Sequence, residues 1–355
     1  MAEPSQPPVR VGVVGGGLIA QLAHLPALRE LDRLFAVHAL AEPSPRVRAA
    51  LARRYGIDAP CRDHAELLDC DDLDAVLVCS PNGTHARVVM DALDAGLHVL
   101  VEKPLCLSPA GADAIVARAR QAERVVQVGY MKRFDPAYER LSGLLGELGA
   151  ARVVTSLTID PGIGERLRPA GYVAPETTAA TTPADDTADQ VAAALGTDDR
   201  RHVAAFSDAF LGALVHDVNL VLGLLPGPWR VADAASADDG SLAYGAFAHE
   251  AGTRWSAAWA HVPGAGTFRE DLALAGAGGV LGLRFPAPYL GSAPAELRVG
   301  GEVERRWSVP ANAYIRQLEH FHACITRGEP CRAPAEQGAR DVELLTDLYR
   351  AAVAA

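Results

Sequence analysis

Three consecutive glycines follow the first apolar run of this 355-residue chain, and they constrain its fold more than any other feature. The run, Val9 to Val14, is rich in β-branched residues, and the glycines lead into a helical pattern. With Ala20 they form a G-x-G-x-x-A sequence, in which Gly15 permits a tight turn and Gly17 lets a pyrophosphate approach the backbone. A strand, a glycine turn and a helix in this order predict a dinucleotide-binding site.

The residues after the glycine turn indicate which dinucleotide binds. Free N–H groups at the start of the helix, at Leu18 and Ile19, are suited to phosphate. Glu42 follows the second apolar run, where a carboxylate accepts from ribose hydroxyls and repels a 2′-phosphate. We therefore predict NAD as the cofactor, while Arg46 and Arg48 follow closely and leave NADP open.

Short apolar runs alternate with helical patterns over residues 1–130. Such runs are typical of βαβ units, whose right-handed crossovers build a parallel sheet buried on both faces. We predict an α/β fold class, in which residues 1–130 form a Rossmann domain with a doubly wound parallel sheet. The expected strands are Val9–Val14, Leu34–Leu40, Ala75–Cys79, Leu97–Val101 and Val125–Val128.

The pattern changes in residues 131–355, where alternating stretches follow one another between Gly, Pro and Asp clusters. Examples are Arg152–Ile159 and Arg254–Ala260. Strand after strand predicts an α+β domain for substrate binding and oligomerisation, with a large open antiparallel sheet covered on one face by helices. The expected helices are Val203–Leu225, Ala313–Thr326 and Glu336–Ala352.

Residues 175–199 fit neither pattern, because they combine clustered Thr, Ala and Asp with few aromatic residues. This composition is typical of a mobile surface loop. A lid over the substrate is the alternative, since long loops in compact domains are often functional.

Composition limits the partners of the chain. It carries 33 Lys and Arg against 44 Asp and Glu, a formal net charge of −11, which argues against nucleic acid or an anionic membrane as partner. The six cysteines show no C-x-x-C pair and no secretory signal is visible, so we expect free thiols and a cytoplasmic protein. Lysine occurs only at Lys103 and Lys132, which suggests positions where arginine cannot serve.

Polar residues cluster where the predicted parallel strands end, and open sheets bind their ligands there. They fall in three segments, Ser80-Pro81-Asn82-Gly83-Thr84-His85, Glu102-Lys103-Pro104, and Gly129-Tyr130 with Arg133-Phe134-Asp135. With the glycine turn, these motifs resemble the Gfo/Idh/MocA oxidoreductases, which include glucose–fructose oxidoreductase and inositol dehydrogenase. The resemblance implies cofactor contacts at Ser80, Pro81, Asn82, His85, Glu102, Lys103 and Arg133.

The resemblance also implies roles for these residues. Lys103 would lie beside the nicotinamide and the substrate oxygen, with Glu102 bracing it and Pro104 fixing the turn, a cis bond being one way to do so. An ammonium group there stabilises alkoxide character, and it can pass a proton if burial and a cationic nicotinamide lower its pKa. The family would further use the sheet of its second domain for dimer or tetramer contacts.

The segment Leu211 to Asn219 resembles the family's helix that carries a catalytic Asp and, four residues on, a catalytic His. His216 matches the His, but Gly212 stands where the Asp would be. Residues i and i+4 share a helix face, so such an Asp could orient the imidazole. Our hypothesis is that Gly212 makes room for a bulkier substrate and that His216 works with Lys103 alone. A satisfied core histidine is the alternative.

Together these expectations describe an NAD(P)-dependent dehydrogenase or ketoreductase. It would transfer a hydride between nicotinamide and a secondary alcohol or ketone of a sugar, amino sugar or cyclitol. Two alternatives stay open: a lyase, epimerase or glycosidase that recycles a tightly bound NAD, and a cofactor-binding regulator without turnover. No metal is expected, because His320 and His322 lack a third ligand at a suitable spacing.

Overall fold

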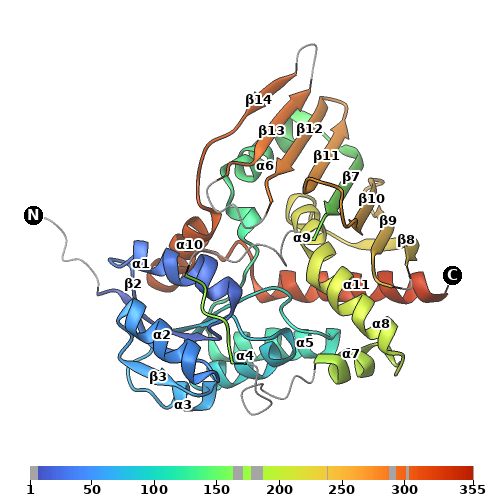
Figure 1. The fold of residues 1–355 in the computed structure, drawn as a ribbon. Helices are drawn as coiled ribbons and strands as arrows, with labels where there is room; N and C mark the ends of the chain where they lie inside the picture. Colours follow the sequence, from blue (N-terminus) through green and yellow to red (C-terminus); the bar gives the residue numbers. More distant parts are fainter. Residues whose placement is uncertain are drawn as a thin grey trace, which may run out of the picture.

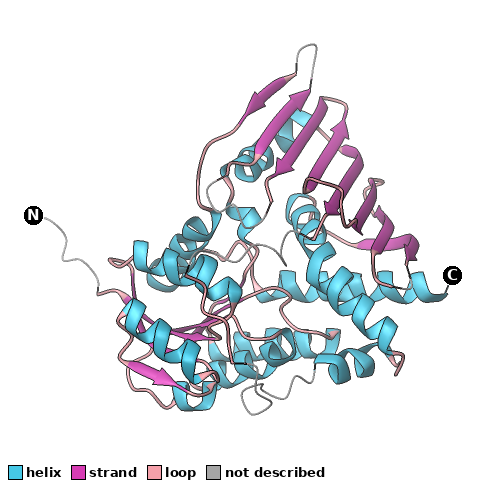
Figure 2. Ribbon diagram, viewed as in Figure 1, coloured by secondary structure: helices cyan, strands magenta, loops and turns pink. Residues whose placement is uncertain are grey.

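The computed structural model describes residues 7–162, 171–176, 187–237, 239–287, 293–300 and 304–354. These residues form two sheets with helices packed on them (Figure 1). One sheet belongs to the N-terminal part, and the larger one rises to the upper right of the view (Figure 2). Of the segment expected to be a loop or lid, residues 177–186 lie outside the described residues.

Six parallel strands form sheet A in the order β3-β2-β1-β4-β5-β6, that of a doubly wound nucleotide-binding sheet. They are β1 (Val9–Val14), β2 (Phe35–Ala41), β3 (Ala59–Cys61), β4 (Ala75–Val78), β5 (His98–Val101) and β6 (Val126–Val128). Val13 in β1 pairs with Leu77 in β4, and both are buried beneath helices, which explains the continuous apolar runs. The predicted parallel sheet is confirmed. The short strand β3 was missed because three residues carry no periodic pattern.

Helices connect the strands of sheet A, and two more, η3 and α6, lead from its last strand to sheet B. They are η1 (Ala20–His24), α1 (Leu25–Glu30), α2 (Pro45–Tyr55), α3 (His64–Leu68), η2 (Asn82–Thr84), α4 (His85–Asp94), α5 (Pro109–Ala122), η3 (Met131–Phe134) and α6 (Pro136–Leu148). Ser44 and Ser108 begin α2 and α5, and each side chain accepts a hydrogen bond from a backbone N–H of the first turn. A proline follows each serine, which favours a helix start at that position.

Eight strands form sheet B in the order β14-β13-β12-β11-β7-β10-β9-β8. They are β7 (Ala151–Asp160), β8 (Trp229–Ser236), β9 (Leu242–His249), β10 (Arg254–His261), β11 (Arg269–Gly276), β12 (Gly279–Phe285), β13 (Glu296–Gly300) and β14 (Arg305–Trp307). The sheet is mostly antiparallel, as expected, although its strands β7 and β10 pair in parallel. The reason is that β7 inserts between β11 and β10, and no hairpin joins it to either neighbour.

The remaining helices are α7 (Thr187–Leu195), α8 (Arg200–Ala205), η4 (Phe206–Leu214), α9 (Val215–Leu224), α10 (Ala313–Arg327) and α11 (Ala335–Ala354). Within the described part of the chain, one helix, Arg200–Leu224, is long and apolar enough to cross a membrane, but most of it is buried inside the protein. Helix α10 was expected on sheet B. It packs instead on the N-terminal part, because its apolar residues Leu318 and Phe321 join the core around β1 and β2.

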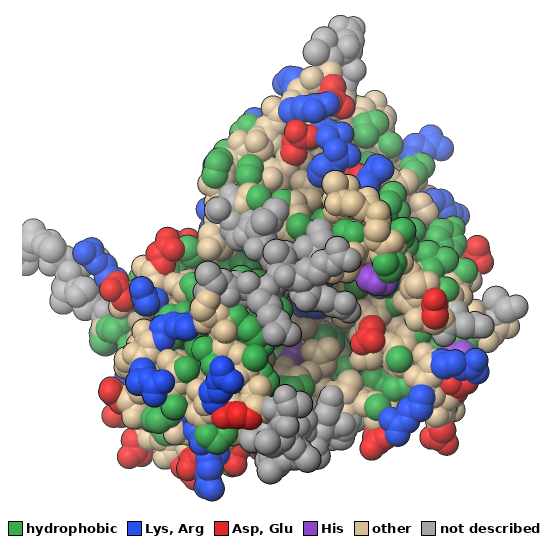
Figure 3. Space-filling view, in the orientation of Figure 1, with side chains coloured by type: hydrophobic (Ala, Val, Ile, Leu, Met, Phe, Trp, Pro, Cys, Tyr) green, Lys and Arg blue, Asp and Glu red, His purple; other side chains and the backbone are tan. Residues whose placement is uncertain are grey.

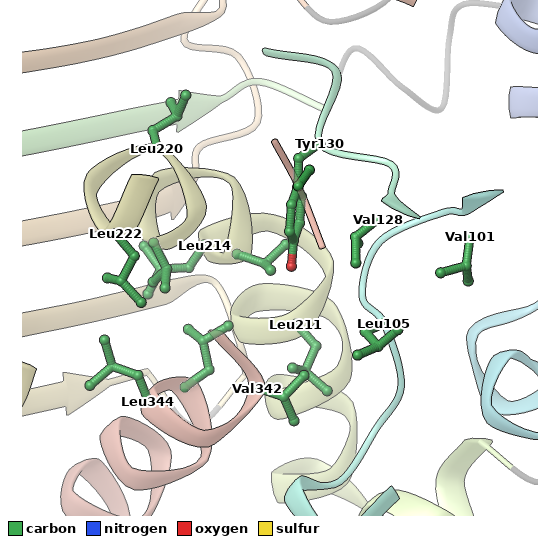
Figure 4. Close-up of a cluster of buried hydrophobic side chains, with 14 of the residues drawn as sticks. Val101, Leu105, Val128, Tyr130, Leu211, Leu214, Leu220, Leu222, Val342 and Leu344 are labelled. Atoms are coloured by element: carbon green, nitrogen blue, oxygen red, sulfur yellow. The ribbon is translucent and has the colours of Figure 1, made fainter. Parts of the chain in front are cut away.

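A hydrophobic cluster joins the two parts of the molecule (Figure 4). Val101 and Val128 come from β5 and β6, Leu211 and Leu214 from η4, and Val342 from α11, and all five are fully buried. The long helix and α11 therefore share one core with the Rossmann sheet. This shared core fixes the position of the long helix relative to the ends of the parallel strands.

One face of sheet B carries helices, whereas the other is built from small or half-buried side chains. Near the upper end of this sheet, basic and acidic side chains are interspersed on the face shown in Figure 3. Arg284 on β12 donates to Asp271 on β11, and Arg298 on β13 donates to Glu296 on the same strand. These pairs balance charge locally on an exposed part of the sheet.

Candidate functional site

A cavity of about 440 Å³ lies where the carboxyl ends of the sheet A strands meet the long helix and sheet B. Its position agrees with the rule that open parallel sheets bind ligands beyond these strand ends. Both lysines of the chain, Lys103 and Lys132, line it. The other predicted site residues in its lining are Leu18, Ile19, Ser80, Asn82, His85, Glu102 and His216.

The glycine turn has the geometry that a dinucleotide phosphate requires. Gly15 has a φ of +96°, and a Cβ added there would lie 2.6 Å from the carbonyl oxygen of Cys79. A Cβ at Gly17 would meet no atom within 4 Å, so the backbone is open on that side. The residues therefore fit the pyrophosphate of a dinucleotide, with the N–H groups of the following helix start as donors.

Glu42 lies at the end of β2, and its carboxylate is fixed beside the glycine turn. It accepts hydrogen bonds of 2.8 Å from the backbone N–H groups of Gly16 and Ser44. The residue is 8% exposed, so its charge faces the crevice and not open solvent. This is the position from which an acidic residue contacts the ribose of a bound dinucleotide.

A second carboxylate, that of Glu176, reaches the start of α2. It accepts from the hydroxyl of Ser44 and, at 3.0 Å, from the backbone N–H of Arg46. The bond from Ser44 holds the pKa of Glu176 below its usual value. The side chain of Arg48 does not turn toward the Glu176 carboxylate, because its guanidinium donates to the carbonyl oxygens of Glu42 and Pro43. Nothing in the sequence indicated Glu176, since it lies 132 residues from Ser44.

Two described pieces of the 161–199 connection rest on the Rossmann part. Gln21 bonds to both backbone groups of Val173, donating at 3.0 Å and accepting at 2.9 Å. Further along, the hydroxyl of Thr187 accepts from the Gly83 N–H at 2.9 Å, and Gln190 donates to the Gly83 carbonyl at 2.7 Å. The segment before the undescribed residues and helix α7 after them are thus both anchored to the nucleotide-binding domain.

The segment after β4 forms η2, and His85 fixes it to the neighbouring turn. One ring nitrogen of the fully buried His85 lies 2.8 Å from the carbonyl oxygen of Pro104, and the other lies 2.9 Å from that of Ser80. Burial lowers the pKa of His85, so the neutral ring carries one N–H and donates to one of these two carbonyls, while its other nitrogen only lies beside the second. Asn82 faces the cavity, whereas Pro81 lies outside its lining.

Glu102 and Pro104 brace the turn that carries Lys103. The Lys103–Pro104 peptide bond is cis. The Glu102 carboxylate lies 2.6 Å from Nε2 of the buried His24 and accepts from the Lys103 N–H at 3.2 Å. Burial opposes ionisation of Glu102, but the bond from His24 and the charge of Lys103 outweigh it, so the pKa of Glu102 is lowered. Glu102 is therefore a charged carboxylate next to Lys103.

The Lys103 ammonium group donates a 2.6 Å hydrogen bond to the backbone carbonyl of Gly212. Gly212 lies in η4, a π-helical stretch that interrupts the regular i to i+4 bonding of the long helix. The lysine thus meets a neutral backbone oxygen. Burial, together with the nearby charge of Lys132, lowers the pKa of Lys103. Such a group can exchange a proton closer to neutral pH than a free lysine can.

His216 lies one turn beyond Gly212 and lines the same cavity. Burial and the positive charges of Lys132 and Lys103 lower the pKa of its ring well below the usual value, so the imidazole is neutral. No other described residue forms a hydrogen bond with this ring. A neutral, unbonded imidazole facing a cavity can accept or donate one hydrogen bond to a ligand.

A charge pair that the sequence did not reveal completes the cavity wall. The Lys132 ammonium group lies 2.5 and 2.6 Å from the two carboxylate oxygens of Glu270, and both residues are buried. Asp217 is buried nearby and bonds to the Thr158 hydroxyl. Burial and the charge of Glu270 raise the pKa of Asp217 to about 7. Lys132 and Glu270 lie 138 residues apart, so no motif could have paired them.

Arg133, predicted to contact the cofactor, lies outside the cavity lining. A Cβ added at Gly223 would lie 2.8 Å from the Arg133 guanidinium carbon and 2.5 Å from the Tyr138 hydroxyl. The side chain therefore points into the interior, toward α9 and α6. The motif resemblance places the residue at the right strand end, but the turn η3 directs its side chain away from the ligand space.

Comparison with known protein families identifies the N-terminal Rossmann domain of this chain. Residues 9–130 match the model of the Gfo/Idh/MocA oxidoreductases, described as an oxidoreductase family with an NAD-binding Rossmann fold. The N-terminal Rossmann domain of this chain therefore matches the Gfo/Idh/MocA family. The glycine turn and the Glu102-Lys103-Pro104 segment both fall within the matched range.

Curated relatives in this family match over part of their length. Inositol 2-dehydrogenase from Paracoccus denitrificans is 36% identical over 170 residues, which cover 44% of this chain and 47% of that protein. Myo-inositol 2-dehydrogenase from Thermotoga maritima is 31% identical over 157 residues, 43% of this chain and 46% of the relative. The chain thus matches about half the length of these relatives.

Solved structures resemble the whole described fold. KijD10, a 3-ketoreductase from Actinomadura kijaniata solved with NADP and TDP-benzene, has a TM-score of 0.74 at 22% identity, covering 95% of this chain and 96% of that one. A putative myo-inositol dehydrogenase from Sinorhizobium meliloti has a TM-score of 0.72 at 20% identity, covering 98% of both chains. These likenesses show that the two-sheet fold extends over nearly the full chain.

Proposed function

We propose that this protein is an NAD-dependent oxidoreductase that interconverts a secondary alcohol and a ketone of a sugar, amino sugar or cyclitol. The observation that carries the proposal is the half-buried Lys103 ammonium group, which lines the same cavity as the neutral His216 at the carboxyl ends of a Rossmann sheet. When bound, the nicotinamide would accept or supply the hydride. The names of the inositol dehydrogenase and ketoreductase relatives support this class of reaction.

Lys103 would act on the substrate oxygen. Its ammonium group holds developing negative charge on that oxygen, and its lowered pKa lets it exchange the hydroxyl proton. Glu102 and the cis turn orient it from below. His216, as a neutral ring, would hold a neighbouring hydroxyl or share the proton with Lys103.

The lining of the cavity suits a ligand with many hydroxyl groups. Lys103 and Lys132 supply donors, while Asp160 and Glu270 supply carboxylate acceptors. A hydroxyl both donates and accepts, so it can bond to either kind of group. The ring of Trp259 adds an apolar wall on the sheet B side. This mixture favours a polyol or sugar over a fatty or aromatic substrate.

The crevice at the start of α2 supports NAD as the cofactor. Both Glu42 and Glu176 place carboxylates there, and they occupy the N–H groups of Ser44 and Arg46. A 2′-phosphate would face two negative charges and would have to displace Glu176. We expect NADH to bind at least about tenfold more tightly than NADPH. The variant Glu176→Gln should narrow this ratio and leave the affinity for NADH unchanged.

A substrate panel tests the proposed function. Sugars, amino sugars and inositols are incubated with NAD and, in parallel, NADP, and the absorbance of reduced nicotinamide is followed. Turnover of a polyol with stoichiometric NADH formation is expected, and His216→Ala should reduce it roughly 10²-fold or more. Undiminished turnover by His216→Ala on the identified substrate contradicts its proposed role.

A second candidate is an enzyme that keeps and recycles its NAD, such as a lyase, epimerase or glycosidase. The contacts of Val173 with Gln21 and of Thr187 with Gly83 favour it, because they anchor the connecting segment over the nucleotide-binding domain. Such an enzyme would release one equivalent of nucleotide per chain only on denaturation. Nucleotide analysis of the heat-denatured, purified protein separates the two candidates.

The uncovered face of sheet B is the proposed contact for a homodimer or homotetramer. Ala258 pairs with Tyr244 on β9 and with Leu157 on β7, and Asp271 and Arg284 continue this row across the sheet. Small central side chains with a charged rim suit packing against a second copy. Light scattering of the wild type and of Ala258→Arg, which should dissociate, tests this assembly.

A further inference from the structure

A histidine and two cysteines converge behind the cavity, between α10 and the segment that follows it. His320 and Cys324 lie four residues apart on α10, so they share one face of the helix. Cys331 returns to them after α10 ends at Gly328, which has a φ of +67°. The ligand atoms of the three side chains all lie within 4.8 Å of one another.

The spacing of these atoms matches a single tetrahedral ion. Zinc–sulfur and zinc–nitrogen bonds of about 2.3 and 2.0–2.1 Å place a sulfur and a nitrogen about 3.6 Å apart around the metal. Cys324 Sγ lies 3.3 Å from His320 Nε2, within a few tenths of this value. Both residues are buried, while Cys331 is partly exposed and leaves an approach for an ion.

The contacts of His320 indicate which of its ring nitrogens would bind the ion. The backbone N–H of Arg332 donates to Nε2 at 3.0 Å, so the ring proton lies on Nδ1, and an ion bound at Nε2 would replace this N–H as the partner of its lone pair. Nδ1 in turn lies 4.0 Å from a carboxylate oxygen of Glu329. Metal-binding histidines commonly donate from their second nitrogen to a carboxylate, and Glu329 would have to move closer to accept such a bond.

We propose that His320, Cys324 and Cys331 form a binding site for a divalent metal of the zinc type, with Glu329 as the positioning residue for His320. The site would fasten the segment after α10 to the helix. That segment also holds the edge of sheet A, because the carbonyl of Ala333 accepts from the Val128 N–H at 2.8 Å. Its role would therefore be structural, since none of the three ligands lines the cavity.

Cobalt titration of the reduced, metal-stripped full-length protein tests this site. Co²⁺ alone should produce the visible bands of a tetrahedral ion and a thiolate-to-cobalt band, saturating at one equivalent per chain, and Zn²⁺ should abolish both. In Cys324→Ser and Cys331→Ser the apparent affinity should fall at least 100-fold. In Glu329→Gln it should fall roughly 10–100-fold, as for other second-layer partners.

Cys61→Ser is the matched control, because Cys61 Sγ lies 3.8 Å from Cys70 Sγ in a second thiol pair. This variant should bind Co²⁺ as the wild type does. Absence of a thiolate-to-cobalt band in freshly reduced wild-type protein overturns the proposal, and so does a band that survives in Cys324→Ser. Zn²⁺ should also raise the melting temperature of the wild type but not that of Cys331→Ser.

Discussion

The two lysines of this chain line one cavity in opposite electrostatic settings. Lys103 donates to the uncharged carbonyl of Gly212, whereas Lys132 lies against both carboxylate oxygens of Glu270. The charge of Lys132 is compensated by its partner, while the charge of Lys103 is opposed by burial. The same residue type thus provides a fixed cation in one place and a group able to give up its proton in the other.

The substitution Lys103→Arg should have the largest effect. Arginine keeps the positive charge but cannot lose its proton at working pH, so kcat should fall roughly 10²–10⁴-fold with cofactor binding preserved. Steady-state kinetics on the identified substrate and a fluorescence titration with NADH measure the two quantities. If Lys103→Arg keeps full activity, proton transfer by Lys103 is wrong.

Breaking the Lys132–Glu270 pair should affect stability more than chemistry. Glu270→Gln leaves a buried ammonium group without its counter-charge, which costs about 3–5 kcal/mol of unfolding free energy. Chemical denaturation measures this loss. The double variant Lys132→Met with Glu270→Met removes both charges and should recover most of it. A double variant as unstable as Glu270→Gln contradicts the explanation.

Asp217, which is buried near the Lys132–Glu270 pair, should make the folding stability of the protein depend on pH. Its pKa is raised to about 7 in the folded protein, above the value of about 3.9 in an unfolded chain. Folding therefore favours the protonated form, and stability is lost as pH rises from about 4 through about 7. Asp217→Asn removes this loss, so its advantage over the wild type should grow by about 2–4 kcal/mol between about pH 5 and pH 8. A difference that does not change with pH shows that Asp217 is charged throughout.

Gly212→Asp should have the smallest effect and should make the surroundings of Lys103 more like those of Lys132. The new Cβ would lie 3.0 Å from the Ser207 carbonyl oxygen, so the helix must shift slightly. A carboxylate near Lys103 raises its pKa, so the corresponding ionisation in the pH profile of kcat/KM should move to higher pH. Gly212→Ala is the steric control, and it should leave this ionisation in place.

Local sequence was sufficient to predict the Rossmann half. Its strands are continuous apolar runs, and the glycine turn, Glu42 and Lys103 follow strand ends, so fold and position could be inferred together. The contacts that define the second half of the site join distant residues. Glu270 on β11 reaches Lys132 on η3 only because the tertiary fold brings these distant elements together, an arrangement that no local pattern encodes.

The same limit applies to the proposed metal site, whose cysteine ligands the sequence did not reveal. His320 and His322 were considered as a pair, but Cys324 shares the face of His320, and Cys331 returns after the end of α10. Glu176 is a further example, since it meets Ser44 through a connection with no regular pattern. Resemblance placed the motif residues, but it did not give the direction of the Arg133 side chain.

The position of α10 has a consequence for the order in which this protein can be made. Leu318 and Phe321 belong to the core around β1 and β2, and Ala333 holds the edge strand β6. The nucleotide-binding domain therefore emerges from the ribosome with its core unfinished and completes it only when the end of the chain is synthesised. A chain cut before α10 would expose apolar surface in the domain that comes first, so premature termination should yield aggregates instead of a free Rossmann domain.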